Sequence, residues 1–189
     1  PVAIEDPERC RRYAGIVYEG VSSRPSPWWL KTALWKTGVR PLNALVDLTN
    51  YVMLSVGQPA HAFDRETVKE GITVRSARAG ETLTLLDGQA LKLCPEDLMI
   101  CDAAGPVALA GIMGGAQDSI LPGTTRMLLE IANFEPIGLR RSASRYQVRT
   151  ESANRNEKGL DTQRVDQAMA VAGELMKRLF PEARMTAFT

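Results

Sequence analysis

Apolar residues recur at helical spacing in two stretches near the start of the chain. The stretch SPWWLKTALWKTG predicts a helix with Ser26 as its N-cap, Pro27 in the first turn and Gly38 just past its end. A second helix is predicted over about residues 43–56, where Gly57 would close it. Two amphipathic helices therefore open the chain.

The middle of the chain has a different pattern, in which short apolar runs rich in β-branched residues alternate with turn signals. These runs are GITVRSA, TLTLLDGQALKL, DLMICD, PVALAGIMGG and MLLEIANF. The dipeptide Asp87-Gly88 is a strong marker of a β-hairpin. The pattern predicts a barrel or sandwich of short strands.

The last third of the chain becomes helical again. EPIGLRRSASRYQV predicts a helix, and the polar run RTESANRNEKGLD is expected to be a solvated loop with helix-capping residues. A final amphipathic helix would turn seven side chains inward: Val165, Ala168, Met169, Ala172, Leu175, Met176 and Leu179. Helices around a strand-rich centre indicate an α+β fold, with residues 1–189 as one domain or as two small lobes sharing a core.

Composition narrows the classes of function. The chain has 23 basic and 22 acidic residues, so no global field attracts nucleic acid. Three cysteines without a CxxC pair, and a single histidine, predict neither a zinc site nor a disulfide framework, which favours a reducing cytoplasm. No apolar run is long enough to span a membrane, so we expect no membrane partner.

The first residues, PVAIEDPERC, show neither a signal-peptide pattern nor an initiator methionine. We therefore expect the chain to be a piece of something longer.

The single histidine, His61, lies in VGQPAHAFD, after the stop signals of the second helix. A histidine of intermediate burial commonly finds a backbone partner in a core or turn, and it is also the usual side chain for proton transfer in a site. From the residues alone, both interpretations stay open.

Two other stretches are candidates for a site. Gly111, Gly114 and Gly115 in LAGIMGGA allow close approach of the backbone, to a ligand or simply to a neighbouring strand. In LLEIANF, strand alternation places Glu130 on one face with Leu128 and Ala132. A carboxylate in such company must be paired or neutral. Either a substrate or an arginine of the following helix (Arg140, Arg141 or Arg145) could be its partner.

One histidine does not make a nucleophile, base and orienter set. If the protein is an enzyme, water is the expected nucleophile and the substrate bond is already activated.

Five motifs in order resemble a known family: NALVDLTNYVMLSVGQPAHAFD, LTLLDG, VALAGIMGG, LLEIANFEPIGLRRSA and RTESANRNEKGLD. Together they resemble the B3/B4 domain of the bacterial phenylalanyl-tRNA synthetase β subunit. The resemblance implies a β-barrel core with an α+β insertion and flanking helices. It implies a place in an α2β2 ligase that uses ATP, magnesium, phenylalanine and tRNA, with no cofactor or metal in this part. The domain is the editing site in that family, where it hydrolyses tyrosine wrongly esterified to phenylalanine tRNA.

The resemblance also implies roles for single residues. Glu130 would accept a hydrogen bond from the tyrosine hydroxyl, His61 would place the water or the ester, and Thr150 would lie beside the amino acid. Gly114 would line the pocket, with Gly115 next to it. Arg40 and Asn50 would lie at the mouth and contact the terminal adenosine of the tRNA 3′ end or the ester.

The chain departs from the family pattern at one place. Ser152 stands where alanine is usual, Ala153 where serine is usual and Asn156 where an aromatic residue is usual. The Ser152 hydroxyl could narrow or rewet the tyrosine pocket, and the loss of the aromatic could loosen the loop. The alternative is therefore a structural module of the β subunit that lacks editing activity. A free-standing editing protein conflicts with the near-neutral charge, because it would need its own basic tRNA surface.

Overall fold

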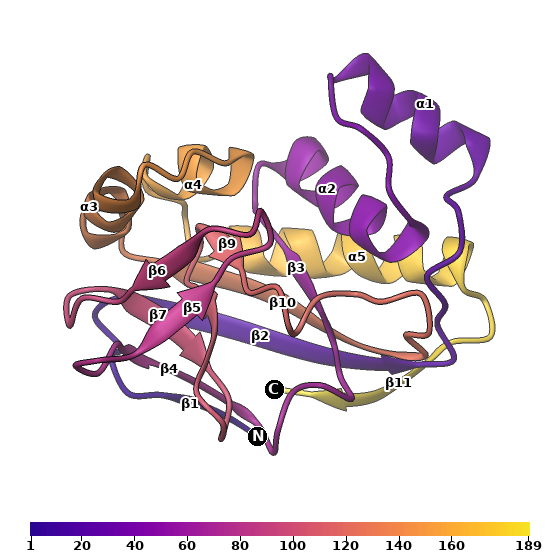
Figure 1. Cartoon of the computed structure of the whole chain (residues 1–189). Helices are drawn as coiled ribbons and strands as arrows, with labels where there is room; N and C mark the ends of the chain where they lie inside the picture. Colours follow the sequence, from indigo (N-terminus) through magenta and orange to yellow (C-terminus); the bar gives the residue numbers. More distant parts are fainter.

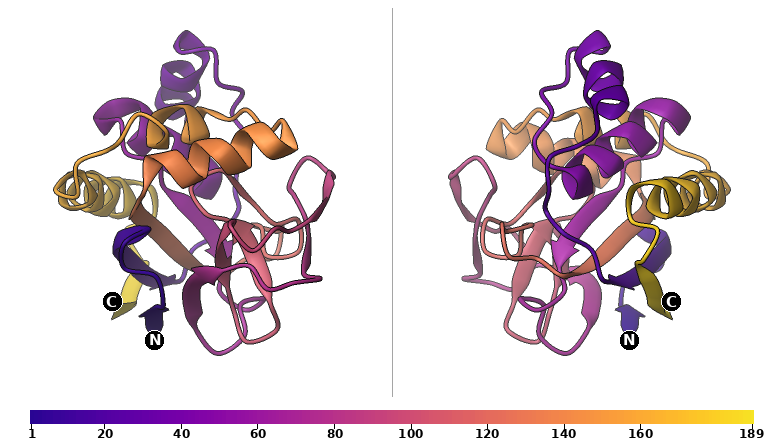
Figure 2. Two further views of the ribbon diagram at one scale, coloured as in Figure 1. Left: turned by 90° about the vertical axis from the view of Figure 1, so that its left-hand side faces the viewer. Right: turned by 90° about the vertical axis from the view of Figure 1, so that its right-hand side faces the viewer.

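The protein, described by a computed structural model over residues 1–189, is built in three layers (Figures 1 and 2). A four-stranded antiparallel sheet forms the middle layer, in the order β11–β2–β10–β3. Its strands are β2 (Cys10–Glu19), β3 (His61–Asp64), β10 (Arg126–Phe134) and β11 (Arg184–Phe188). Two helices, α2 (Ala44–Val56) and α5 (Arg164–Leu179), cover one face of this sheet, and α1 (Trp28–Lys36) packs on α2 farther from the sheet.

A second sheet packs against the other face of the middle layer. It has five strands in the order β1–β4–β7–β8–β9. They are β1 (Val2–Ile4), β4 (Ile72–Ser76), β7 (Leu98–Cys101), β8 (Pro106–Leu109) and β9 (Met113–Gly114). A separate hairpin joins β5 (Thr82–Thr84) to β6 (Ala90–Lys92), and its turn contains Gly88 with φ of 88°. The helices α3 (Pro136–Tyr146) and α4 (Glu151–Asn156) lie beside this layer.

The α+β class is confirmed, with one difference from the expected architecture. The β-barrel core does not form, because no backbone hydrogen-bond ladder joins the two main sheets, which pack on each other through their apolar faces. The strands of the second sheet have at most five residues. Their apolar faces are buried by packing on the long strands β2 and β10, so closure into a barrel is not needed.

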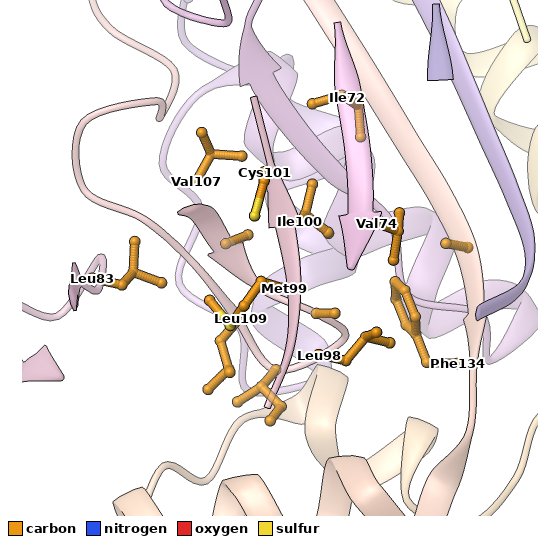
Figure 3. Packing of buried hydrophobic residues seen from close by; sticks show 14 of the residues in the cluster. Ile72, Val74, Leu83, Leu98, Met99, Ile100, Cys101, Val107, Leu109 and Phe134 are labelled. Carbon is orange, nitrogen blue, oxygen red and sulfur yellow. The ribbon is translucent and has the colours of Figure 1, made fainter. Parts of the chain in front are cut away.

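Alternation along β10 separates two hydrophobic cores. Leu128, Ala132 and Phe134 face the second sheet, where Figure 3 shows Phe134 with side chains of β4 and β7. Met127, Leu129 and Ile131 face α1, α2 and α5. The period of two places Glu130 on the side of the second sheet, as the sequence predicts.

Local sequence explains the ends of the helices. The Asn43 side chain caps α2 by accepting from the N–H groups of Leu45 and Val46, and Gly57 ends it with φ of 75°. The prediction that Ser26 caps α1 is wrong. Its hydroxyl instead donates to the buried carboxylate of Asp47 at 2.5 Å, and α1 begins after Pro27 without a side-chain cap.

The polar run after α3 is also not the solvated loop that its composition predicts. It forms α4, because the Thr150 hydroxyl accepts from the N–H of Ala153 and caps the helix. Ala153 and Asn156 are buried by this turn of helix. Six residues are too few for a helical period to be visible in the sequence.

Candidate functional site

A cavity of about 80 Å³ lies between the middle layer, the second sheet and α4. Its walls come from segments far apart in sequence: the start of β3, strands β7 to β10 and two residues of α4. Four of the residues proposed from sequence are in the lining, namely His61, Gly114, Glu130 and Ser152. The fold therefore gathers half of the eight predicted site residues around one hollow.

Glu130 is held in the centre of β10, opposite His61 of β3 and Gly15 of β2. It is only 5% exposed, and its Oε2 atom has no hydrogen-bond partner. Burial raises the pKa of Glu130 from 4.5 to about 8. At neutral pH this carboxyl is therefore mostly protonated, so it can donate as well as accept a hydrogen bond.

His61 lies directly beside Glu130, since opposite residues of an antiparallel pair project to the same face. Its Nε2 atom is buried without a partner, and its ring packs edge-on against Phe63 with 4.5 Å between centroids. Burial lowers the pKa of His61 to about 4, so the imidazole is neutral. The interpretation of His61 as a core residue satisfied by a hydrogen bond does not fit this geometry.

The glycines at the end of β8 and in β9 are there for steric reasons. A Cβ on Gly114 would lie 2.6 Å from Nε2 of His61, and a Cβ on Gly115 would lie 2.6 Å from the carbonyl oxygen of Val107. Gly111 has φ of 68°, and a Cβ there would lie 2.6 Å from Leu139. Gly114 makes room for the imidazole, whereas Gly115 makes room for a neighbouring strand.

The wall at α4 is polar. The hydroxyl of Ser152 donates to the carbonyl of Gly111 at 2.8 Å, and the amide of Asn156 donates to the same carbonyl at 3.0 Å. Thr150 is not in the lining, and its hydroxyl donates to the carbonyl of Ile112 at 2.8 Å. Asn156 is buried and tied down, so the loss of the aromatic residue does not leave this segment loose.

Arg40 and Asn50 lie apart from the cavity lining. Arg40 is exposed between α1 and α2, and Asn50 is half-buried on α2. The structure therefore does not bring them together with His61 and Glu130.

No arginine reaches Glu130. Arg145 instead pairs with the fully buried Asp97 at 2.5 Å, while Arg140 and Arg141 are exposed on α3. The alternative of a structural ion pair for Glu130 is thus absent from the structure.

Several residues around the site were missed from the sequence. Tyr13 of β2 has a buried hydroxyl without a partner, and its pKa is raised well above 10 by burial and then by the charge of Glu130. Phe134 also lines the cavity, beside Ala132, which the sequence places on the face of Glu130. The same alternation could have identified Phe134, because it follows Glu130 by four residues.

The arrangement suits the binding of a small ligand that has an apolar body and a polar end. Two uncharged but titratable groups lie side by side, and apolar side chains line most of the remaining wall. Nowhere do three or more His, Cys, Asp or Glu side chains gather as metal ligands would. None of the five helices combines the length and apolar character needed to cross a bilayer.

Several proteins to which this chain is similar in sequence share one name. Phenylalanine--tRNA ligase beta subunits are 44% identical in Aquifex aeolicus over 171 residues and 49% identical in Anaeromyxobacter dehalogenans over 161 residues. These matches cover 90% and 85% of this chain but only 22% and 20% of the relatives. The chain thus spans about a fifth of the length of these relatives.

A solved structure shows the same fold at low identity. It is an N-terminal fragment of the phenylalanyl-tRNA synthetase beta subunit from Pyrococcus horikoshii, with a TM-score of 0.52 and 11% identity, covering 91% of this chain and 48% of that one. The model of the B3/4 domain matches residues 9–181. The chain belongs to the B3/4 domain family.

Proposed function

We propose that this domain is the editing module of a phenylalanine-tRNA ligase β subunit, acting in the cytoplasm with an α subunit in an α2β2 enzyme. It would hydrolyse the ester of tyrosine mischarged on phenylalanine tRNA. ATP and magnesium would serve the aminoacylation centre elsewhere in the enzyme. The family and the names of the relatives support this assignment.

One observation carries the assignment of the site. Four carboxylates are buried in this protein, and three of them are satisfied by hydrogen bonds: Asp47, Asp64 and Asp97. The fourth, Glu130, has an orphan oxygen and lines a cavity. A buried polar group without a partner is costly, so a ligand that supplies the partner gains that free energy.

A phenol supplies this partner and a phenyl ring does not. The tyrosine hydroxyl can donate to Glu130 or accept from its protonated form, whereas phenylalanine would leave the carboxyl unpaired. An unpaired buried group costs about 1–3 kcal/mol, or roughly tenfold to a hundredfold in selectivity. The apolar pocket of an aminoacylation site rejects an amino acid with one added hydroxyl by only about a hundredfold. A second site that selects for the hydroxyl therefore raises the overall accuracy.

The hydrolysis needs little from the protein, because an aminoacyl ester is already activated. Water adds to the ester carbonyl and the acyl–oxygen bond breaks. The products are free tyrosine and a tRNA whose 3′-terminal ribose has its hydroxyl group again. The neutral imidazole of His61 can accept a hydrogen bond from that water and hold it in place. Thr150 acts as a positioning residue, because its two hydrogen bonds hold α4 against the segment of Ile112. Arg40 and Asn50 lie outside the cavity lining, and their proposed role is to contact the terminal adenosine of the tRNA.

The test uses the complete synthetase and phenylalanine tRNA charged with tyrosine. Glu130→Ala should release tyrosine at least about tenfold more slowly, because the hydroxyl loses its partner. Glu130→Gln should keep most of the activity, since an amide imitates the neutral acid. A matched control is Glu8→Ala, at an exposed glutamate. Equal rates in wild type and Glu130→Ala would overturn the assignment.

A structural module without editing remains the second candidate, favoured by the small cavity volume and by the polar side chains of Ser152 and Asn156 in its wall. Titration with free tyrosine separates the two functions. Saturable binding that depends on Glu130 supports editing, and absence of binding supports the structural module.

A further inference from the structure

The lining of the cavity follows one strand and includes two different groups of polar side chains, which we call its two ends. Glu130, Ala132 and Phe134 project into it from the same face of β10. Four residues of strand separate Glu130 from Phe134 by about 13 Å. The first end holds Glu130 beside His61, which in turn contacts the position of Gly114.

The second end is formed around Gly111. A Cβ on Gly111 would lie 2.7 Å from the ring of Phe134 and 3.0 Å from Nδ2 of Asn156. Asn156 and Ser152 of α4 line this end, and Gly111 and Ser152 are half-buried rather than sealed. Between the two ends, the wall is apolar, with Ile100, Leu109 and Ala132 in its lining.

The amide of Asn156 is fixed in orientation by its neighbours. Nδ2 donates to the carbonyl of Gly111 at 3.0 Å and to the hydroxyl of Ser152 at 3.3 Å, and both oxygens can accept. The opposite atom, Oδ1, is buried without a partner in a residue that is 2% exposed. This oxygen can only accept a hydrogen bond, so any group that becomes its partner must be a donor.

We propose that Oδ1 of Asn156 binds the α-ammonium group of the amino acid whose hydroxyl reaches Glu130. The inference rests on the proposed function and adds a specificity-determining residue to it. Tyrosine has a hydroxyl, a ring and an ammonium group in the same order as the cavity has Glu130, an apolar strip and Asn156. A hydrogen bond from an ammonium is charge-assisted and therefore stronger than one from a neutral donor.

The test compares two ligands that differ only in this group. Tyramine carries the phenol and the ammonium, whereas 4-ethylphenol carries the phenol alone. Binding of each to the complete synthetase is measured by calorimetry or ligand-observed NMR. The variant Asn156→Leu, of similar volume, should weaken tyramine about tenfold or more and change 4-ethylphenol less than about twofold. Asn156→Asp keeps an acceptor and should retain the preference for tyramine.

The control ligand also reports on folding. If Asn156→Leu weakens both ligands equally, Asn156 acts only through the shape of the pocket, and the inference is overturned. If neither ligand is affected, Oδ1 is satisfied by water alone, which overturns it as well. Failure of the proposed function looks different: neither phenol then binds in a manner that depends on Glu130. That result would remove the inference together with the editing site.

Discussion

Two buried acidic residues in this protein have opposite surroundings. Asp97, just before β7, is fully buried and accepts four hydrogen bonds. The donors are Ser142 at 2.6 Å, Arg145 at 2.5 Å, the hydroxyl of Tyr146 and the N–H of Cys94 at 2.8 Å. Glu130 is about as deeply buried but lies beside an imidazole, with an orphan oxygen and no cation.

Under the proposed function, the difference separates a structural group, Asp97, from a binding group, Glu130. Asp97 ties α3 to the second sheet through an arginine, and its hydrogen-bonding capacity is used within the fold. Glu130 links no two elements through its side chain, and no hydrogen bond to its Oε2 atom offsets the free-energy cost of burying it. A buried carboxyl is therefore informative about function only once its partners have been counted, because burial alone is the same in both cases.

The largest expected effect is on the structural member of the pair. Asp97→Ala should lower the free energy of unfolding by about 3–5 kcal/mol, because it removes the acceptor of four hydrogen bonds worth about 1 kcal/mol each, one of them from a guanidinium. Glu130→Ala should cost far less or stabilise, since it removes an unpaired group. Urea denaturation of both variants measures the contrast. Equal losses would show that Glu130 is also part of the structural framework.

The second effect is a dependence on pH that belongs to Glu130. Its pKa is raised from 4.5 to about 8, so above pH 6.5 the folded state holds a proton that the unfolded state has lost. Stability should therefore fall as pH rises from 6.5 to 8, by up to ~1.4 kcal/mol for each pH unit. Below pH 6.5 the lowered pKa of His61 acts in the opposite direction and masks this trend.

Unfolding curves across this range, for wild type and Glu130→Gln, test the assignment. The slope should disappear in the variant, because glutamine does not titrate. A slope that persists unchanged would mean that another group holds the proton.

A third test changes the space around the site without touching either acid. Gly114→Ala should cost about 1–3 kcal/mol of stability and displace the His61 ring, because the new Cβ would lie 2.6 Å from it. Editing should fall together with stability. Gly173→Ala in α5 is the matched control, with no atom within 4 Å of the new Cβ and an expected gain of up to ~1 kcal/mol. If Gly114→Ala behaves like this control, the imidazole is not held where the structure places it.

The smallest effect concerns the polar wall. Ser152→Ala removes the hydrogen bond to the carbonyl of Gly111 and the longer one from Nδ2 of Asn156. Because Asn156 still donates to that carbonyl, a loss of only about 0.5–1.5 kcal/mol is expected. Thermal unfolding and editing rates should both change only slightly. A large gain in editing would show that the hydroxyl obstructs the pocket, as the departure from the family pattern first suggested.

The elements that the sequence predicted carry either a helical period or a short apolar run between turn signals. The final helix and α2 show the period, and β4, β7 and β8 show the apolar runs. The strand β2 was missed because residues 14–18 are buried on both faces and show no alternation. The strand β11 was missed for the opposite reason, since all five of its residues are exposed.

Less of the candidate site than of the fold could be predicted from the residues alone. Alternation placed Glu130 on an apolar face, but nothing in the spacing of the chain pairs it with His61. His61 and Glu130 are neighbours because of the register between β3 and β10, and this register depends on packing across the whole sheet. The convergence of His61, Gly114, Glu130 and Ser152 was predicted through resemblance to a family. In the sequence, Asn156 is only a departure from the family pattern, and its unpartnered oxygen is a property of the fold.

The strand β10 works as a partition with two insulated sides. On one side, three apolar residues of β10 pack against the helical layer. On the other side, Glu130, Ala132 and Phe134, which alternate with them, face the cavity. Exchanges on the cavity side can retune what is recognised while the anchorage on the far side stays intact. A protein engineer could therefore rewrite selectivity here at alternate positions only, leaving the intervening ones as the fixed frame.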